Sequence, residues 1–224
     1  MEQNKQRIVV KVGTSTLTHN SGALDLWSME HLVRTLADLQ GMGHEVILVS
    51  SGAIAVGTAK LGLSERPKEL RMKQAAAAVG QCRMMHIYDK FFSEYNRSMA
   101  QILLTGDDVE DPERAEHLSN TFSALLEMGV IPVVNENDSV SSAEIETGRH
   151  KVLGDNDTLS AIVAELCRAD LLVLLSDIDG LYDADPKTHP EAKLLHQVTE
   201  LTPEILEMAG GICLLYTSPS PRDG

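Results

Sequence analysis

The sequence IVVKVGTS, residues 8–15, decides the fold class of this chain. Residues 8–12 form an apolar run broken only by Lys11, which is the pattern of a strand buried on both faces. Strands of this kind belong to parallel sheets that helices cover on both sides. Gly13, Thr14 and Ser15 follow at once, so the strand ends in a turn with a permissive backbone and two hydroxyl groups.

The rest of the chain alternates apolar runs of strand length with segments of helical period. We expect further strands at residues 45–49, 99–104, 130–134 and 171–175. Helices are expected around residues 32–39, at 69–92, 114–128 and 158–168, and from Pro203 onward with Thr202 as the N-cap. This alternation predicts an α/β protein with a largely parallel sheet.

Composition narrows the classes of function. The chain has 224 residues, of which 43% are hydrophobic and 23% charged, the balance of a globular protein. Its formal net charge of -14 would repel phosphate backbones, so we expect no nucleic acid as a partner. We find no signal-peptide pattern and no apolar run of membrane-spanning length, so we expect no membrane contact and a cytoplasmic location.

The three cysteines, Cys82, Cys167 and Cys213, are widely spaced and form no CxxC pair. A disulfide framework is therefore not expected. Cys82 and Cys167 lie within apolar helical patterns, which favours small core residues over ligands. The eight histidines show no metal-ligand spacing, and we expect no metal held by protein ligands alone.

Polar and small residues gather directly after the expected strands. They are Lys11, Gly13, Thr14 and Ser15; Ser50, Ser51 and Gly52; Thr105; Asn135, Asn137 and Asp138; and Ser176, Asp177 and Gly180. In an open parallel sheet, ligands bind outside the carboxyl ends of the strands. The sequence therefore predicts a binding crevice at that edge, without naming a reaction.

Each of these groups allows more than one interpretation. Lys11 is either a cation for phosphate groups or a strand-end lysine that reaches solvent. The SSGA segment, residues 50–53, either binds an anion at a helix N-terminus or caps an ordinary helix. In GDND, residues 154–157, the carboxylates orient a lysine, attract magnesium or cap a helix. The NEND segment, residues 135–138, either grips an ammonium group or forms an exposed polar loop.

Several familiar signatures are missing from the sequence. It contains no GxxxxGK[ST] loop and no GxGxxG after the first strand, which argues against a P-loop kinase and a dinucleotide-binding Rossmann enzyme. HExxH, GxSxG and the protein-kinase signatures are also absent.

Eight segments in order identify a family. They are IVVKVGTSTLT, VILVSSGAIAVG, AAAAVGQ, ILLTGDD, NTFSALL, IPVVNENDSV, GDNDTLSA and LLSDIDGLYDADP. Together they resemble the glutamate 5-kinases, a branch of the amino-acid kinase family, over residues 8–211. The resemblance implies a three-layer αβα sandwich with an open, mainly parallel sheet, incomplete at the C-terminus. It also implies transfer of the ATP γ-phosphoryl group to the glutamate side-chain carboxylate, the first step of proline synthesis.

The resemblance also implies roles for residues and partners. Lys11 and Asp157 would be catalytic: Lys11 would stabilise the transferring phosphoryl group, and Asp157 would orient the Lys11 side chain. Glutamate would be held by Ser51, Asp138 and Asn156. The nucleotide would be contacted by Lys11, Gly13, Thr14, Ser176 and Asp177. The implied cofactors are ATP and Mg²⁺, with proline as a feedback inhibitor and a homo-oligomer as the assembly of the full-length protein.

The sequence departs from the family pattern at two places. TGRHKV before GDND is longer than usual, which affects the register around Asn156. After Gly211 the sequence ICLLYTSPSPRDG stands where relatives carry a glycine-rich GTGGM-type segment and a second lysine. We therefore expect residues 1–211 to be part of an amino-acid kinase domain, residues 212–224 to be an unrelated or disordered tail, and the activity to be low.

Two other functions fit the same features. A related kinase could use another acceptor, such as acetylglutamate, aspartate, carbamate or a nucleoside monophosphate, although Gly13 is single where several of those families carry two glycines. A degenerate kinase fold could also bind an amino acid or a nucleotide as a sensor, without catalysis.

Overall fold

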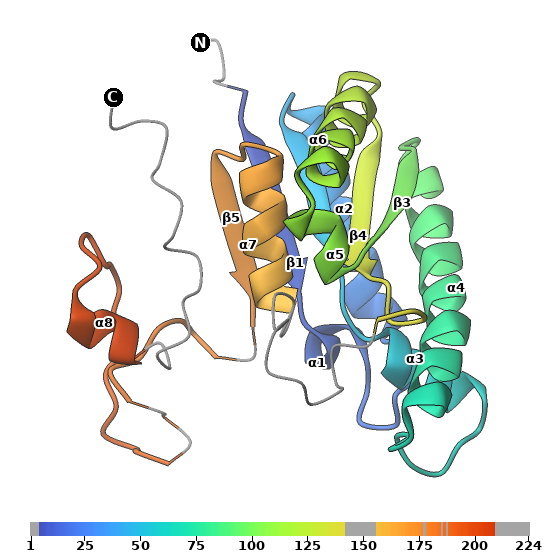
Figure 1. Cartoon of the computed structure of the whole chain (residues 1–224), viewed down its shortest axis with the longest axis horizontal. Helices are drawn as coiled ribbons and strands as arrows, with labels where there is room; N and C mark the ends of the chain where they lie inside the picture. The colour runs from blue at the N-terminus through green and yellow to red at the C-terminus, as the bar shows by residue number, and fades with distance from the viewer. Residues whose placement is uncertain (1–4, 142–155, 177, 185, 187, 209–224) are drawn as a thin grey trace. The chain divides into compact units, whose positions relative to one another are not determined.

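The computed structural model of this chain describes residues 5–141, 156–176, 178–184, 186 and 188–208 (Figure 1). The chain divides into two compact units, Met1–Leu175 and Ser176–Gly224. The strands and all but one of the helices within the described residues belong to the first unit.

A five-stranded sheet forms the centre of the first unit. Its strands are β1 (Arg7–Val12), β2 (Glu45–Val49), β3 (Met99–Leu104), β4 (Ile131–Glu136) and β5 (Leu171–Leu175). They lie in the order β3-β4-β2-β1-β5, and every neighbouring pair is parallel. All five strands were predicted, although β4 begins one residue later than expected and continues to Glu136. The expected parallel sheet is confirmed.

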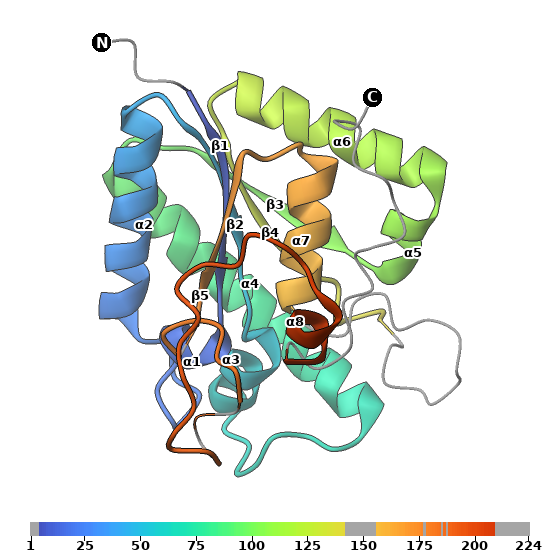
Figure 2. The ribbon, with the colours of Figure 1, turned by 90° about the vertical axis from the view of Figure 1, so that its left-hand side faces the viewer.

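Helices cover both faces of this sheet, so the unit has three layers (Figure 2). One face carries α2 (Leu26–Gly41), α3 (Ala53–Lys60) and α4 (Leu70–Glu94). The other face carries α6 (Pro112–Glu127) and α7 (Asn156–Leu166), with the short α5 (Gly106–Glu110) beside α6. The shorter α1 (Thr14–Leu17) follows β1. The expected αβα sandwich is confirmed.

Alternation along β1 assigns each of its side chains to one layer. Val10 and Val12 pack into the core on the side of α2 and α4, whereas Val9 packs with α6 and α7. Since side chains of a strand alternate between faces, Lys11 belongs to the same face as Val9. The only charged residue of the strand after Arg7 is thereby directed toward the α7 layer.

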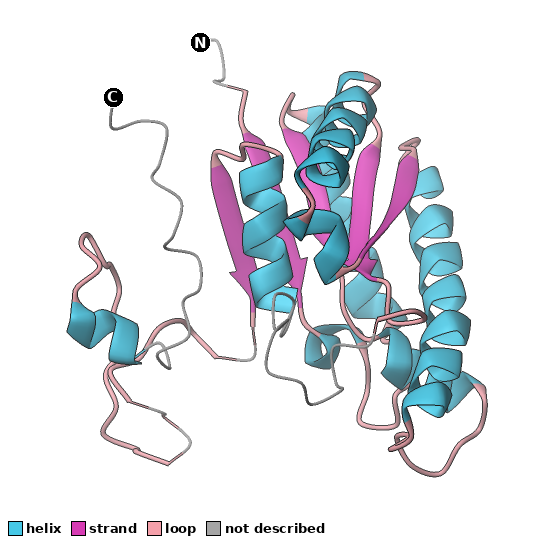
Figure 3. Ribbon diagram, in the orientation of Figure 1, coloured by secondary structure: helices cyan, strands magenta, loops and turns pink. Residues whose placement is uncertain are grey.

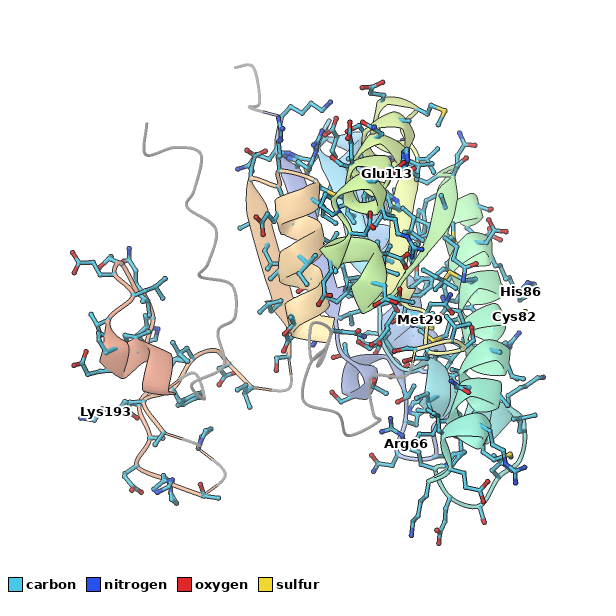
Figure 4. The ribbon with its side chains drawn as sticks, in the orientation of Figure 1. Met29, Arg66, Cys82, His86, Glu113 and Lys193 are labelled. Atoms are coloured by element: carbon cyan, nitrogen blue, oxygen red, sulfur yellow. The ribbon has the colours of Figure 1, made fainter. Side chains whose placement is uncertain are left out.

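The cysteine prediction is half correct. Cys167 is buried in the core between the sheet and α7, and burial raises the pKa of its thiol to about 12. Cys82 is exposed, so its assignment to the core was wrong. Both Cys82 and His86 lie on the outer side of α4 (Figure 4), because α4 buries the neighbouring Gln81 and Met84 instead.

The second unit carries one regular helix within its described residues, α8 (Pro203–Met208). The backbone N–H of Ile205 donates to the Thr202 hydroxyl at 3.4 Å, so the predicted start of this helix is confirmed. An isolated antiparallel bridge joins Tyr182 to Leu194. Much of the rest of the described part is loop (Figure 3). Among all described residues, no helix is both long and apolar enough to cross a membrane.

A charged cluster ties the amino ends of β1 and β2 together. Glu45 accepts a hydrogen bond from Arg7 Nε at 2.7 Å, and Lys5 Nζ lies 2.6 Å from its other oxygen. Burial acts to raise the pKa of Glu45, but the hydrogen bonds from Lys5 and Arg7 outweigh it and lower the pKa below its usual value. The charged form of Glu45 therefore stabilises the folded chain.

We expect Glu45→Gln to destabilise the chain by about 1 kcal/mol at pH 7. A depressed carboxyl pKa contributes stability above the unfolded-state pKa, near 4.3, and loses it as the pH falls through the folded-state value. The difference between the two proteins in urea midpoint should therefore shrink below about pH 4. A difference that stays constant from pH 7 to pH 3 would contradict a role for the Glu45 charge.

Candidate functional site

The carboxyl ends of the five strands lie at one edge of the sheet, because all neighbours are parallel (Figure 3). In the sheet, β2 lies on one side of β1 and β5 lies on the other side of β1. Such a reversal of strand order opens a crevice in α/β proteins. The end of β1 is therefore the natural centre of a binding site in this unit.

Lys11 stands at this centre and forms an ion pair with Asp157. Its Nζ lies 2.6 Å from Asp157 Oδ1. The Lys11 side chain is 12% exposed and that of Asp157 is 54% exposed, so the pair lies at the boundary between protein and solvent. We predicted a helix from Thr158 with Asp157 as a possible cap. The helix instead begins at Asn156, so Asp157 lies in its first turn and holds Lys11.

Asn156 joins the ends of three elements. Its side-chain Nδ2 donates to the Ser50 carbonyl oxygen at 3.1 Å and to the Ser51 hydroxyl. The Asn135 Oδ1 at the end of β4 lies 3.4 Å from the same nitrogen. Asn135, Ser50 and Ser51 are all buried. Two of the three residues predicted to hold glutamate, Ser51 and Asn156, are therefore in direct contact.

The glycine-containing turns after β1 and β2 lie against each other. Gly52 has a φ of 102°, a conformation that favours glycine, and a Cβ there would lie 3.2 Å from Thr14 Cγ2. Gly52 is the N-cap of α3 and, as a glycine, makes no side-chain hydrogen bond to the first turn of this helix. SSGA therefore supplies the N-cap of a helix, as one alternative predicted, whereas anion binding at the same N-terminus stays a prediction.

The remaining residues of the prediction, four for the nucleotide and Asp138 for glutamate, fall into three groups. Gly13 and Thr14 lie beside Lys11, since a Cβ on Gly13 would lie 3.6 Å from Lys11 Nζ. Ser176 is the first residue of the second unit, and Asp177 lies outside the described residues. Asp138 lies in the turn that follows β4, at the same edge as Lys11 and Ser51.

Sequence reasoning missed two polar residues that α4 contributes behind this site. Gln81 Oε1 accepts a hydrogen bond from Asn135 Nδ2 at 2.9 Å. The Tyr88 hydroxyl and Ser50 Oγ lie 2.9 Å apart, and burial raises the pKa of Tyr88. The available signal was weak, because Gln81 is one polar residue at the end of the alanine-rich AAAAVGQ segment.

The donors and charges at this edge suit anionic ligands. Lys11 supplies a cation, Ser51 and Thr14 supply hydroxyls, and the uncapped first turn of α3 supplies backbone N–H groups. Within the ranges that the structure describes, no three His, Cys, Asp or Glu residues gather to hold a metal ion. This arrangement can position negatively charged reactants.

The chain matches the model of the amino acid kinase family over residues 6–212. It is 54% identical over 209 residues to the glutamate 5-kinase of Clostridium perfringens, covering 93% of this chain and 77% of that protein. It is 53% identical over 206 residues to the glutamate 5-kinase of Clostridium tetani, covering 92% of this chain and 75% of that protein. The chain thus spans about three quarters of the length of these relatives.

Solved structures agree on the fold. The UMP kinase of Ureaplasma parvum superposes with a TM-score of 0.56 at 16% identity, covering 93% of this chain and 87% of that one. At this identity the likeness concerns the fold alone.

Proposed function

The chain belongs to the amino acid kinase family and within it to the glutamate 5-kinases, and from this premise we propose how its residues carry out ATP-dependent phosphorylation of the glutamate side-chain carboxylate. The observation that carries the proposal is the meeting of Lys11, Asp157, Asn156 and Ser51 at one edge of the sheet. These residues come from β1, α7 and the end of β2, and each matches a motif of the family.

Lys11 and Asp157 serve as the catalytic pair in this proposal. Phosphoryl transfer requires placement of the reactants in line and stabilisation of charge spread over the transferring group. The Lys11 ammonium group supplies that stabilisation. Asp157 holds Lys11 at 2.6 Å, so the cation is oriented before the reactants arrive.

Ser51, Asn156 and Asp138 hold glutamate. The Ser51 hydroxyl accepts from the Asn156 amide and keeps its own hydrogen to donate to a substrate carboxylate, so Asn156 acts by holding that hydroxyl in place, and Asp138 accepts from the substrate ammonium group. The side-chain carboxylate of glutamate has a pKa near 4.3 in solution, so it is ionised at neutral pH and attacks without a general base. The site therefore has no need of a histidine.

The nucleotide is held by Lys11, Gly13 and Thr14 and by Ser176 and Asp177. Gly13 has no side chain between the backbone and Lys11, which allows phosphate groups to approach both. The roles of Ser176 and Asp177 rest on the motif SDIDGLYDADP alone.

We propose that Mg²⁺ enters with ATP. Mg²⁺ in kinase sites is bound mainly by phosphate oxygens and water, with one or two carboxylates from the protein. The part of the chain that the structure describes has no three-residue cage for a metal, but the Asp157 carboxylate is exposed, and these features fit a cation that the nucleotide carries. Bound there, Mg²⁺ would neutralise phosphate charge.

Four finer points belong to the same proposal. Proline inhibits the enzyme, the full-length protein forms a homo-oligomer, and the protein works in the cytoplasm, where ATP and glutamate are both available. Residues 1–211 form the kinase part and residues 212–224 lie outside it, which the end of the family match at residue 212 supports.

A panel of acceptors tests the activity. We expect ADP release from ATP with L-glutamate to exceed release with aspartate, acetylglutamate, carbamate or UMP by at least about a hundredfold, because a site built to pair with each polar group of one acceptor leaves those groups unpaired with another. Single-turnover conditions with the chain in excess allow a low rate to be measured.

The Clostridium perfringens relative in the same assay is the positive control. A preference for another acceptor would overturn the choice of glutamate. Thermal stabilisation by glutamate or ATP without any ADP release, even after a GTGGM-type segment and its lysine replace the sequence after Gly211, would instead identify a sensor.

A further inference from the structure

We propose that Gln81 is a positioning residue of the glutamate site. It fixes the orientation of the Asn135 side-chain amide, which in turn orients Asn156 and, through Asn156, the Ser51 hydroxyl. The inference rests on the proposed function for the identity of the ligand. Gln81 itself lies on α4 and touches neither Ser51 nor Asn156 directly; it acts through Asn135.

The connection is a relay of side chains across three elements. Gln81 Oε1 on α4 accepts a hydrogen bond from Asn135 Nδ2 on β4 at 2.9 Å. The oxygen of the same Asn135 side chain lies 3.4 Å from the Asn156 Nδ2 on α7. Asn156 in turn donates to the Ser51 hydroxyl. Gln81 and Asn135 are 8% and 2% exposed, so water does not compete with these bonds.

The direction of the relay depends on the oxygen of Gln81. A side-chain amide presents an acceptor oxygen on one side and a donor nitrogen on the other. Because Gln81 Oε1 accepts a hydrogen bond from Asn135 Nδ2, the Oδ1 of Asn135 faces Asn156. A reversed Asn135 would set its NH₂ group against that of Asn156, and the two donors would repel. Gln81 thus excludes the reversed state.

Gln81 also keeps a buried donor without a partner. Its Nε2 forms no hydrogen bond with any described residue and is shielded from solvent. An unsatisfied buried donor costs free energy of folding, which an apolar side chain of the same length would avoid. The glutamine offsets this cost by supplying the acceptor for the buried Nδ2 of Asn135, so its contribution is to satisfy and orient Asn135.

A second glutamine supplies a matched comparison. Gln40 on α2 donates from its Nε2 to the Gly129 carbonyl oxygen at 2.8 Å. Gly129 precedes β4, so this bond lies toward the amino ends of the strands, away from the site. Tyr88 would not serve, because it bonds to Ser50, whose carbonyl oxygen accepts from Asn156. Loss of the Gln40 bond leaves the relay unchanged.

The first test compares Gln81→Met with Gln40→Met in the full chain. Both are the same substitution, keep the approximate length of the side chain and remove one hydrogen bond of a side-chain amide. We expect Gln81→Met to raise the KM for glutamate about tenfold, since an interaction of this kind is worth about one factor of ten, while the KM for ATP changes less than about twofold. Gln40→Met should leave both KM values within about twofold. Equal effects of the two changes on the KM for glutamate would overturn the proposal.

A second measurement needs no ligand. In ¹⁵N-labelled chain, the side-chain NH₂ signals of Asn135 and Asn156 are assigned by their loss in Asn135→Ala and Asn156→Ala. In Gln81→Met we expect the Asn156 signals to move and their exchange with water to rise about tenfold, and in Gln40→Met we expect neither. Unchanged Asn156 signals in Gln81→Met would overturn the positioning role.

The two measurements separate the two proposals. If the Asn156 signals respond to Gln81 but the unaltered chain neither binds nor phosphorylates glutamate, the relay stands and the proposed function fails. If the chain phosphorylates glutamate but the Asn156 signals do not respond to Gln81, the function stands and the relay fails.

Discussion

Replacing Lys11 by alanine should lower the rate of phosphoryl transfer to glutamate by about a hundredfold or more. Lys11 is the cation of the described site, held by Asp157 at 2.6 Å at the end of β1. Its charge acts on the negative charge of the transferring group, where a preorganised contact has its largest effect on rate. No general base takes part, so the loss should be nearly the same at pH 6.5 and pH 8.5.

The fold should survive this change. Lys11 is the last but one residue of β1, and its apolar neighbours Val9, Val10 and Val12 keep the strand in the core. Without Lys11, the Asp157 carboxylate is not left buried and unpaired, because its side chain is 54% exposed to water. The melting temperature should therefore stay within about 3 °C of that of the unaltered chain.

ADP release and the melting temperature are measured side by side. Lys90→Ala is the matched control, since Lys90 is an exposed lysine on α4 and should affect neither quantity. Near-normal turnover in Lys11→Ala with an intact fold would remove Lys11 from the chemistry. A large drop in melting temperature would instead assign to Lys11 a structural role.

The sequence predicted the strands well because their signal is local. Apolar runs such as Ile8–Val12 are typical of strands in parallel sheets whose faces are covered by helices. Leu171–Leu175 has the same pattern, although it forms the edge strand β5 and exposes Leu171 and Leu174. The contact of Lys11 with Asp157, 146 positions apart in the chain, could be expected only from the family resemblance. It depends on the face of β1 to which Lys11 belongs and on the position of α7.

The prediction failed where two local patterns compete. In GDND, both Asn156 and Asp157 are good capping residues, and the pattern does not show that the helix includes them. Along α4, an alanine-rich segment has little contrast between its faces, so the exposure of Cys82 and the burial of Gln81 could not be distinguished. Only the packing of α4 against α3 and the sheet determines which side faces inward.

That packing gives the second large effect. We expect Gly80→Ala to destabilise the chain by about 3 kcal/mol or more. A Cβ on Gly80 would lie 1.8 Å from the Ala53 carbonyl oxygen of α3, and the atom it meets is backbone that cannot rotate away. Gly57 on α3 makes the same close approach, since its Cβ would lie 1.7 Å from the Ala76 carbonyl oxygen. The two helices therefore cross with their backbones in contact.

Intrinsic helix propensity acts in the opposite direction, which makes the test sharp. Alanine is better than glycine in a helix by about 1 kcal/mol, so Gly80→Ala would stabilise α4 if α3 were not there. Ala78→Gly, at an exposed position of α4, is the matched control and should cost only about 1 kcal/mol. For a chain of this size we expect a fall in melting temperature of about 6–12 °C for Gly80→Ala and about 2–4 °C for Ala78→Gly.

Gly80→Ala should also weaken glutamate binding at the site. To accommodate a methyl group on Gly80, α3 must move away from α4, and α3 begins directly after Ser51 and Gly52. The neighbouring Gln81 is the residue that fixes Asn135, so a shift of α4 would disturb the glutamate side of the site from two directions. At a temperature where Gly80→Ala is still folded, its KM for glutamate should rise more than its KM for ATP. A Gly80→Ala chain as stable as the unaltered one would show that the two helices do not approach each other as closely as described here.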